Sequence, residues 1–215
     1  MRTIRWCDLR VVPALLIALP LCLPLGCGDG SDAANGQAAI DPPAFSKEVQ
    51  AVIQQKTGLI EQLVAQERVV SAVRAANQEN ASLTEPDIRS FDARWQATEG
   101  LDETIKPYLT NDCALALVEF QETNDAFPEL LVTDARGLLV AATNKSSDYL
   151  QADEPWWVEA FDEGRGRSHT GPIEYDASAR SEAISIYVPI LDDESGQAIG
   201  VIKAVCDVVA IKMEL

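Results

Sequence analysis

The residue types that carry out catalysis are sparse in this 215-residue chain. Its one histidine, His169, directly follows Ser168, and neighbouring side chains on an extended segment point to opposite faces, so the two cannot pair as base and nucleophile. Asp153 and Glu154 are also adjacent, whereas the two carboxylates of a glycosidase must flank a bond. The chain has no Gly-x-Ser-x-Gly elbow, no His-Glu-x-x-His motif and no glycine-rich phosphate loop. The sequence therefore does not predict an enzyme.

The cysteines do not form a metal-binding pattern. No Cys-x-x-Cys pair or Cys/His cluster is present, so neither a zinc site nor a cofactor is predicted. Cys113 and Cys206 each lie in an apolar stretch. A disulfide between them is one expectation for an oxidising compartment, and two separately buried thiols are the alternative.

The chain between residues 44 and 124 has helical periodicity. From Phe45 to Val73 apolar residues recur every three or four positions, which predicts one long helix from about 44 to 76. Thr84-Glu85-Pro86-Asp87 has the capping hydroxyl, the acid three residues later and the proline that begin a second helix, which Gly100 ends. Similar spacing predicts a third helix from about 107 to 121.

After Phe127-Pro128 the pattern changes to short runs rich in β-branched residues, which predict strands at 130–133, 138–141, 184–190 and 198–205. A further strand is expected around 169–175, and a short helix near 155–161. Turn-rich links at 134–137 and 192–196 fit antiparallel hairpins. The predicted fold is α+β: a long N-terminal helix and two further helices, followed by a PAS-like antiparallel sheet of about five strands with a short helical insert.

Two stretches of the chain resemble Cache sensor domains. The first runs from Pro128-Glu129-Leu130-Leu131-Val132-Thr133 to Asp153-Glu154-Pro155-Trp156-Trp157, and the second, 183–190 with 196–203, is similar to the last two strands of that family. The resemblance covers roughly residues 44 to 210, because Cache domains place a long helix ahead of the sheet. It implies an extracytoplasmic ligand-sensing domain with a helical part at 44–124 and a sheet with a ligand pocket at 125–215.

In Cache domains the ligand lies against the sheet, beneath a loop and short helix that correspond here to Tyr149 through Ala160. Paired aromatic rings make a rigid apolar wall, and a few acids or hydroxyls orient the ligand. The alternative for either tryptophan is plain core packing under the helix. The resemblance implies these pocket residues: Tyr149, Asp153, Glu154, Trp156, Trp157, Tyr175, Asp176 and Tyr187.

The amino-acid-sensing members of the family hold the ligand carboxylate with an arginine at the position that is Glu154 here. A carboxylate ligand would meet a like charge at that residue. The family's acid for the ligand ammonium falls at Val205, or at Asp207 after a shift of two places. A cationic amine bound by Asp153 or Glu154 and the tryptophan faces is therefore the sharper hypothesis, and capping of the short helix by either acid is its alternative.

The N-terminus has the pattern of an export signal. A basic start is followed by an apolar run of roughly 15 residues, which prolines interrupt and which is shorter than the roughly 20 residues of a membrane-spanning helix. Leu25-Gly26-Cys27 resembles a bacterial lipobox, with Pro24 where a leucine is usual, and ordinary signal cleavage or a buried cysteine is the alternative. We therefore expect a signal peptide at 1–26, lipidation of Cys27, a flexible tether at 27–43 and a location outside a bacterial membrane.

The composition excludes one class of partner. The net charge is −17, and no cluster of lysine or arginine offsets it locally, so nucleic-acid binding is not expected.

The first hypothesis is a non-catalytic Cache sensor that binds a small molecule and acts through a partner protein, since no membrane helix follows its last strand. The second is a structural or adaptor lipoprotein with a closed pocket, whose long helix pairs with another protein. An open polar cavity under Trp156 and Trp157 would favour the first.

Overall fold

The periodic segment near the N-terminus forms two helices, α1 (Lys47–Val64) and α2 (Glu67–Asn80). They appear in a computed structural model that describes residues 45–176 and 181–215, so the expected signal peptide, Cys27 and the tether lie outside the described residues. The prediction of one continuous helix was wrong at Gln66, whose backbone is extended with ψ 137°. Apolar spacing continues across this break through Val69 and Val70, so the spacing could not reveal it.

Three further helices follow before the sheet. α3 (Glu85–Ala97) begins at the predicted capping box, in which the Thr84 hydroxyl accepts from the backbone of Asp87 and the Asp87 carboxylate accepts from the backbone of Thr84. The predicted third helix is divided into α4 (Lys106–Thr110) and α5 (Asp112–Thr123). Asn111 is extended between them and caps α5 by accepting a hydrogen bond from the backbone of Ala114 at 2.8 Å.

The sheet has five antiparallel strands in the order β2-β1-β5-β4-β3. The strands are β1 (Glu129–Asp134), β2 (Leu139–Ala142), β3 (His169–Asp176), β4 (Ser181–Leu191) and β5 (Ala198–Asp207). α6 (Pro155–Phe161) and a short 3-10 turn, η1 (Asp162–Gly164), lie between β2 and β3, and α7 (Val208–Met213) follows β5. The predicted α+β fold and its five strands are confirmed.

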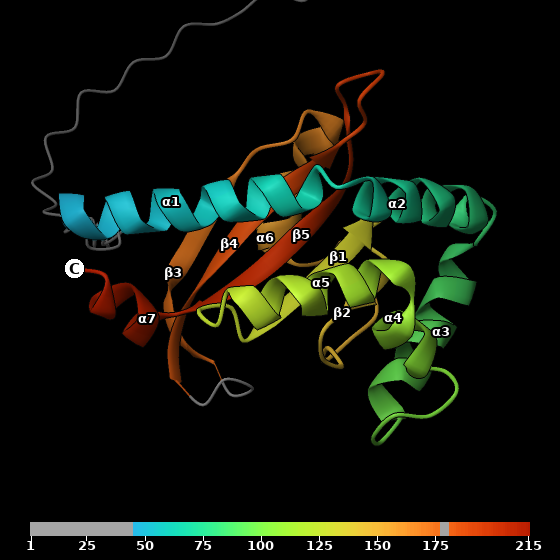
Figure 1. Cartoon of the computed structure of the whole chain (residues 1–215). Helices are drawn as coiled ribbons and strands as arrows, with labels where there is room; N and C mark the ends of the chain where they lie inside the picture. Colours follow the sequence, from blue (N-terminus) through green and yellow to red (C-terminus); the bar gives the residue numbers. More distant parts are fainter. Residues whose placement is uncertain (1–44, 177–180) are drawn as a thin grey trace, which may run out of the picture. The chain divides into compact units, whose positions relative to one another are not determined.

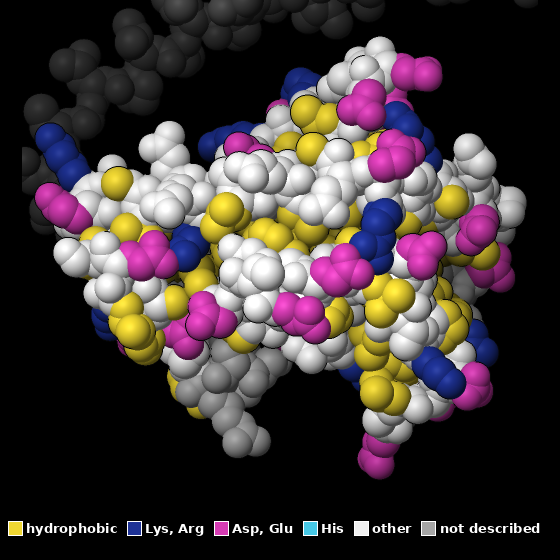
Figure 2. All heavy atoms as spheres, in the orientation of Figure 1, with side chains coloured by type: hydrophobic (Ala, Val, Ile, Leu, Met, Phe, Trp, Pro, Cys, Tyr) yellow, Lys and Arg dark blue, Asp and Glu magenta, His cyan; other side chains and the backbone are white. Residues whose placement is uncertain are grey.

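Each face of the sheet has its own cover (Figure 1). α1, α2, α5 and α7 pack over one face, and their apolar residues join those of the strands in the main hydrophobic core. Figure 2 shows hydrophobic side chains in the seam between α1 and α5, bordered by acidic and basic ones. The opposite face is covered in part by α6, which contacts β4 and β5. Helices therefore cover the second face less completely than the first.

α3 and α4 lie beside β2, where an aromatic cluster fills a smaller core. Trp95 is fully buried and its indole N–H donates to the carbonyl of Ser146 at 3.0 Å. Its ring lies 5.2 Å from that of Tyr108 and 5.9 Å from that of Tyr149. These contacts attach the loop after β2 to the helical part of the chain.

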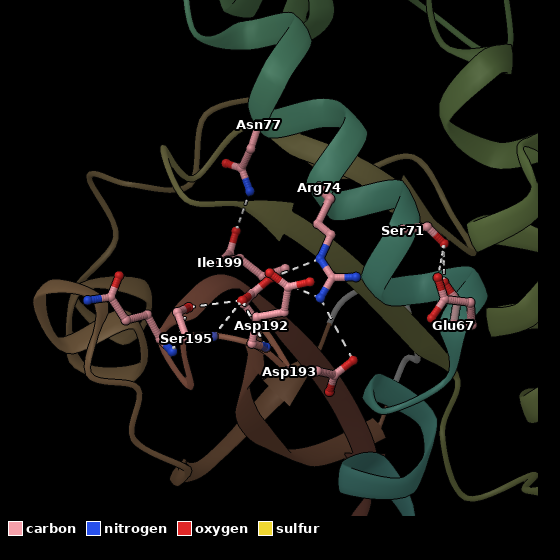
Figure 3. A network of polar contacts seen from close by, with 10 residues as sticks. Glu67, Ser71, Arg74, Asn77, Asp192, Asp193, Ser195 and Ile199 are labelled. Atoms are coloured by element: carbon pink, nitrogen blue, oxygen red, sulfur yellow. Dashed lines mark hydrogen bonds and ion pairs between the residues drawn. The ribbon is translucent and has the colours of Figure 1, made fainter.

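Polar contacts from α2 fasten the hairpin turn between β4 and β5 (Figure 3). The Arg74 guanidinium lies 2.9 Å from the Asp192 carboxylate, which also accepts hydrogen bonds from the backbone and hydroxyl of Ser195. One helical turn further on, Asn77 donates to the carbonyl of Ile199 at 2.8 Å. Because α2 contacts the turn through Arg74 and β5 through Asn77, the turn is held against the helix.

The two cysteines of the described part are separately buried thiols, not a disulfide. Cys113 lies on α5 and Cys206 on β5, and both are fully buried in the main core. Burial raises the pKa of each thiol to about 12. The alternative of two separately buried thiols therefore applies, with each sulfur in the main hydrophobic core. Over residues 45–176 and 181–215 no helix has the length and apolar character needed to cross a membrane.

Candidate ligand-binding pocket

The second face of the sheet carries a cavity of about 240 Å³, here called the sheet-face pocket. Strand alternation brings its walls together, because Tyr187 on β4 pairs with Lys203 on β5, and Ala183 on β4 pairs with Glu174 on β3. The segment from the loop after β2 into α6 closes the opposite side. The lining residues are Ser147, Asp148, Gln151, Glu154, Trp156, Pro172, Glu174, Tyr175, Ala183, Ser185, Tyr187 and Lys203.

A stacked pair of aromatic rings forms one wall of the sheet-face pocket. The rings of Trp156 and Tyr187 have centroids 5.0 Å apart and planes 12° apart. The ammonium of Lys203 lies 5.7 Å from the centre of the Trp156 ring, within the range of a cation–π contact. A cation supplied by the protein therefore already lies near this tryptophan.

Acidic groups act on the same wall. Burial raises the pKa of the Tyr187 hydroxyl, the side chain of Ser185 opposes that shift, and the carboxylates of Glu174 and Glu154 add to it. Both glutamates line the sheet-face pocket together with Tyr187. The sheet-face pocket thus presents acidic groups and one ammonium group to the same small volume.

The loop that closes the pocket is fixed from outside. The Asp92 carboxylate on α3 accepts hydrogen bonds from the backbone N–H groups of Tyr149 and Leu150, at 2.8 and 3.1 Å. The backbone N–H of Gln151 donates to the carbonyl of Gly137 at 2.8 Å. Gly137 has φ +70°, and a Cβ atom there would lie 2.5 Å from the backbone nitrogen of Ala152, so only glycine fits. The β1–β2 turn and α3 together hold this wall in place.

A smaller cavity of about 190 Å³ adjoins the sheet-face pocket and shares Ser147, Gln151 and Lys203 with it. Its remaining walls include Glu129 and Lys145. Lys203 therefore stands between the two cavities, on a strand whose other residues are mostly buried. A ligand longer than the first cavity has room to extend past this lysine.

Four of the eight predicted site residues line the sheet-face pocket: Glu154, Trp156, Tyr175 and Tyr187. Glu154 occupies the N-cap position of α6 but makes no side-chain capping bond, so the capping alternative does not apply to it. Trp157 does not line this pocket: its indole N–H donates to the Thr133 hydroxyl at 2.9 Å and its ring stacks on Phe161. It follows the core-packing alternative.

Two other predicted residues do not line the sheet-face pocket, and a third cannot be placed. Tyr149 is buried in the aromatic cluster beside β2, 4.6 Å from the ring of Phe91, and does not line the sheet-face pocket. Asp153 is exposed and is not among the lining residues. The side chain of Asp176 lies outside the described residues. Asp207, the shifted position of the family's acid, does not line the sheet-face pocket and caps α7 by accepting from the backbone of Val209 at 2.7 Å.

Sequence reasoning missed Lys203, Ser185 and Glu174, which line the sheet-face pocket. A usable signal was present in β5, where Lys203 interrupts an apolar run in a central strand. A charged residue in such a strand needs either a partner or a polar cavity. Pairing register, which the sequence does not reveal, decides that this lysine lies opposite Tyr187.

His169 supports the pocket without lining it. Its Nε2 lies 3.6 Å from the Glu159 carboxylate on α6, and its ring lies 4.7 Å from that of Tyr187. Burial lowers the pKa of His169, with the Glu159 carboxylate opposing the shift. The neighbouring Ser168 is exposed.

No protein-family model and no curated protein matches the sequence. Among solved structures the chain is similar to the sensor domain of E. coli DcuS, with 10% identity over 79% of this chain and 98% of that one and a TM-score of 0.48. It is also similar to the sensor domain of the V. cholerae histidine kinase DctB (12% identity, TM-score 0.45) and to the ligand-binding domain of the Pseudomonas fluorescens chemoreceptor CtaA in complex with L-valine (15% identity, TM-score 0.45).

Each of these last two matches covers 78% of this chain, and the chain spans 53% of the DctB domain and 58% of the CtaA domain. The order of the described helices and strands defines the fold. The helices precede the sheet, α6 is inserted between β2 and β3, and the strand order is β2-β1-β5-β4-β3. The described elements form a PAS-like α+β fold, with helices ahead of a five-stranded antiparallel sheet.

Proposed function

We propose that this chain is an extracytoplasmic, non-catalytic sensor module that captures a small polar molecule in the sheet-face pocket. The observation that carries the proposal is the cavity itself: about 240 Å³ on the free sheet face, with a stacked Trp156–Tyr187 wall and charged groups of both signs. Concave sites with an aromatic wall and a few converging polar groups are typical of ligand pockets.

The charges indicate the class of ligand. Lys203 lies in the cation–π position at Trp156 that a simple amine was expected to take. Its ammonium suits an anionic group of the ligand, and the Glu154 and Glu174 carboxylates near Tyr187 suit a cationic one. The ligand of this proposal therefore carries both charges, with a carboxylate or phosphate at Lys203 and an ammonium at the acids.

The location and the partner are proposals that the sequence supports. The basic and apolar start and the Leu25-Gly26-Cys27 sequence support export and lipidation at Cys27. A lipid on Cys27 would hold the module at a membrane surface without crossing it. Ligand binding would therefore be passed on through a partner protein that contacts the module.

The adaptor alternative has less support. It requires a long helix with a free apolar face, but the apolar residues of α1 and α2 are buried in or packed against the main core, except for two exposed alanines, Ala51 and Ala75. The exposed residues of α1 are mostly polar: Lys47, Glu48, Gln50, Ala51, Gln54, Gln55, Glu61 and Gln62. These helices thus pack against the sheet and present little apolar surface to a helical partner.

A thermal-shift screen of the purified protein tests the proposal. The panel contains amino acids, carboxylates without an amine, amines without a carboxylate, and purines. A ligand that binds only the native state raises the melting temperature, by an amount that grows with its concentration. We expect zwitterionic compounds to raise it and matched amines and carboxylates to raise it less. A panel without any hit would overturn the proposal.

Trp156→Ala assigns any hit to the sheet-face pocket. The substitution removes the stacked wall against Tyr187, so we expect the ligand-induced shift to fall by most of its size. Val158→Ala, on the exposed side of the same helix, is the matched control and should keep the full shift. Equal ligand-induced shifts of the melting temperature in both variants would show that the ligand binds at another site.

A further inference from the structure

A second cavity, of about 670 Å³, lies between α2, α3, α4 and β2 and is here called the helix-side cavity. It shares no lining residue with the sheet-face pocket. Its volume is within the range of small-molecule sites, roughly 300–1,000 Å³. Its walls are Ala72, Ala75, Ala76, Glu79, Asn80, Phe91, Arg94, Glu103, Thr104, Pro107, Tyr108, Asn111, Asp112, Cys113, Leu139, Val140 and Tyr149.

The space exists because α2 presents small side chains to it. Ala72, Ala75 and Ala76 are spaced at three and four residues, so their methyl groups lie on one side of the helix. Glu79 follows on the same side, one turn further along. Large aromatic side chains come from the opposite walls.

Three aromatic rings from separate elements meet at this cavity. Phe91 comes from α3, Tyr108 from α4 and Tyr149 from the loop after β2. The Tyr149 ring lies 4.6 Å from that of Phe91 and 5.6 Å from that of Tyr108. The guanidinium of Arg94 lies 4.9 Å from the centre of the Phe91 ring, so this cluster already attracts one cation of the protein.

The charged groups of the cavity are mainly acidic. Glu79, Glu103 and Asp112 line it against the single cation Arg94, and no ion pair of the described residues involves these three acids. The Glu79 carboxylate raises the pKa of Tyr108 in addition to the larger effect of burial. Glu79 on α2 and Tyr108 on α4 thus both line the helix-side cavity.

We propose that the helix-side cavity is a second small-molecule site, which binds an organic amine or quaternary ammonium ion. The cationic head would lie between the aromatic rings and the Glu79 carboxylate, where ring quadrupoles and charge both favour it. Within the described ranges no three acidic, histidine or cysteine side chains converge to hold a metal ion, so the site suits an organic cation.

Isothermal titration calorimetry with choline and with its neutral isostere 3,3-dimethylbutan-1-ol tests the charge requirement. The two probes have nearly the same shape and differ in the quaternary nitrogen. We expect saturable binding of one choline per chain and at least about tenfold weaker binding of the alcohol, since only the cation gains from the rings. No saturable choline binding, or equal binding of both probes, would overturn the proposal.

Four variants locate the binding. Ala75→Leu extends a side chain into the cavity from an exposed helix position and should abolish choline binding, whereas Gln78→Leu, on the same helix but outside the lining, should leave it unchanged. Glu79→Gln keeps the shape but removes the charge and should weaken choline about three- to tenfold. Trp156→Ala, in the separate sheet-face pocket, should leave choline binding unchanged. Loss of choline binding in Trp156→Ala, or none in Ala75→Leu, would contradict the proposed site.

Discussion

Trp156 and Trp157 are neighbours in the chain but serve different purposes. Successive residues of a helix project about 100° apart, so the two indoles of α6 leave the helix in different directions. Trp156 lies against Tyr187 in the sheet-face pocket, and Trp157 is 7% exposed and donates its indole hydrogen to Thr133. The sequence predicted an aromatic pair at this position, but which ring would be buried depends on how α6 is rotated against the sheet.

Trp157→Phe should therefore reduce stability more than Trp156→Phe. The first substitution removes a buried hydrogen bond and part of a packed ring, at a cost of about 1–3 kcal/mol in the free energy of unfolding. The second keeps an aromatic wall at a half-buried position and should cost under about 1 kcal/mol. Urea unfolding of both variants provides the comparison. Equal losses would mean that Trp157 is not the structural residue of the pair.

At the scale of elements, sequence motifs predicted the helix boundaries that depend on neighbouring residues. Thr84 and Asp87 cap α3 as their spacing predicted, and α6 has the predicted bounds. The breaks at Gln66 and Asn111 were not predicted, because apolar spacing continues through them. At these positions packing on the sheet overrides the tendency of a periodic segment to remain one helix.

The contact between α2 and the β4–β5 turn has a pH dependence that can be measured. Hydrogen bonds from Ser195 and the neighbouring Arg74 lower the pKa of Asp192 to about 2. Since the folded-state pKa lies below the unfolded value of about 4, this carboxylate stabilises the fold above pH 4 and loses that effect as the pH falls towards 2. Asp192→Asn should lower the melting temperature at pH 7, and the difference from the parent should shrink between pH 4 and pH 2.

Glu194→Gln is the control for this measurement, since it removes an exposed acid from the same turn. We expect it to leave the melting temperature at pH 7 nearly unchanged. A constant difference between the parent and Asp192→Asn over the whole acid range would show that the loss comes from something other than the carboxylate charge.

At the scale of the molecule, charge is the dominant global property. The net charge is −17, so like charges repel over distances longer than one contact. The ion pairs of the described residues are largely exposed, as in Arg68–Glu119 and Arg165–Glu163, and such pairs contribute about 0–1 kcal/mol each. Salt screens both the long-range repulsion and the exposed ion pairs, and the repulsion involves many more charges.

Added salt should therefore stabilise the protein at pH 7. Between 0.01 and 0.1 M the screening length falls from about 30 to about 10 Å, which weakens the long-range repulsion more than the short ion pairs. We expect the melting temperature to rise across this range in calorimetry, equally for sodium and potassium chloride. A lower melting temperature at higher salt would show that the ion pairs stabilise the fold by more than the repulsion destabilises it.

The sequence by itself determined that helical segments precede five strands with a short helical insert, and it located the two hairpin turns, because these depend on neighbouring residues. Only the tertiary structure decided that Lys203 enters the sheet-face pocket, that Trp157 does not, and that Tyr149 lines a separate cavity. Strand register and helix rotation select these side chains, and both are set by packing between segments distant in the chain. Residue type predicted the chemistry available, and packing decided which residues meet.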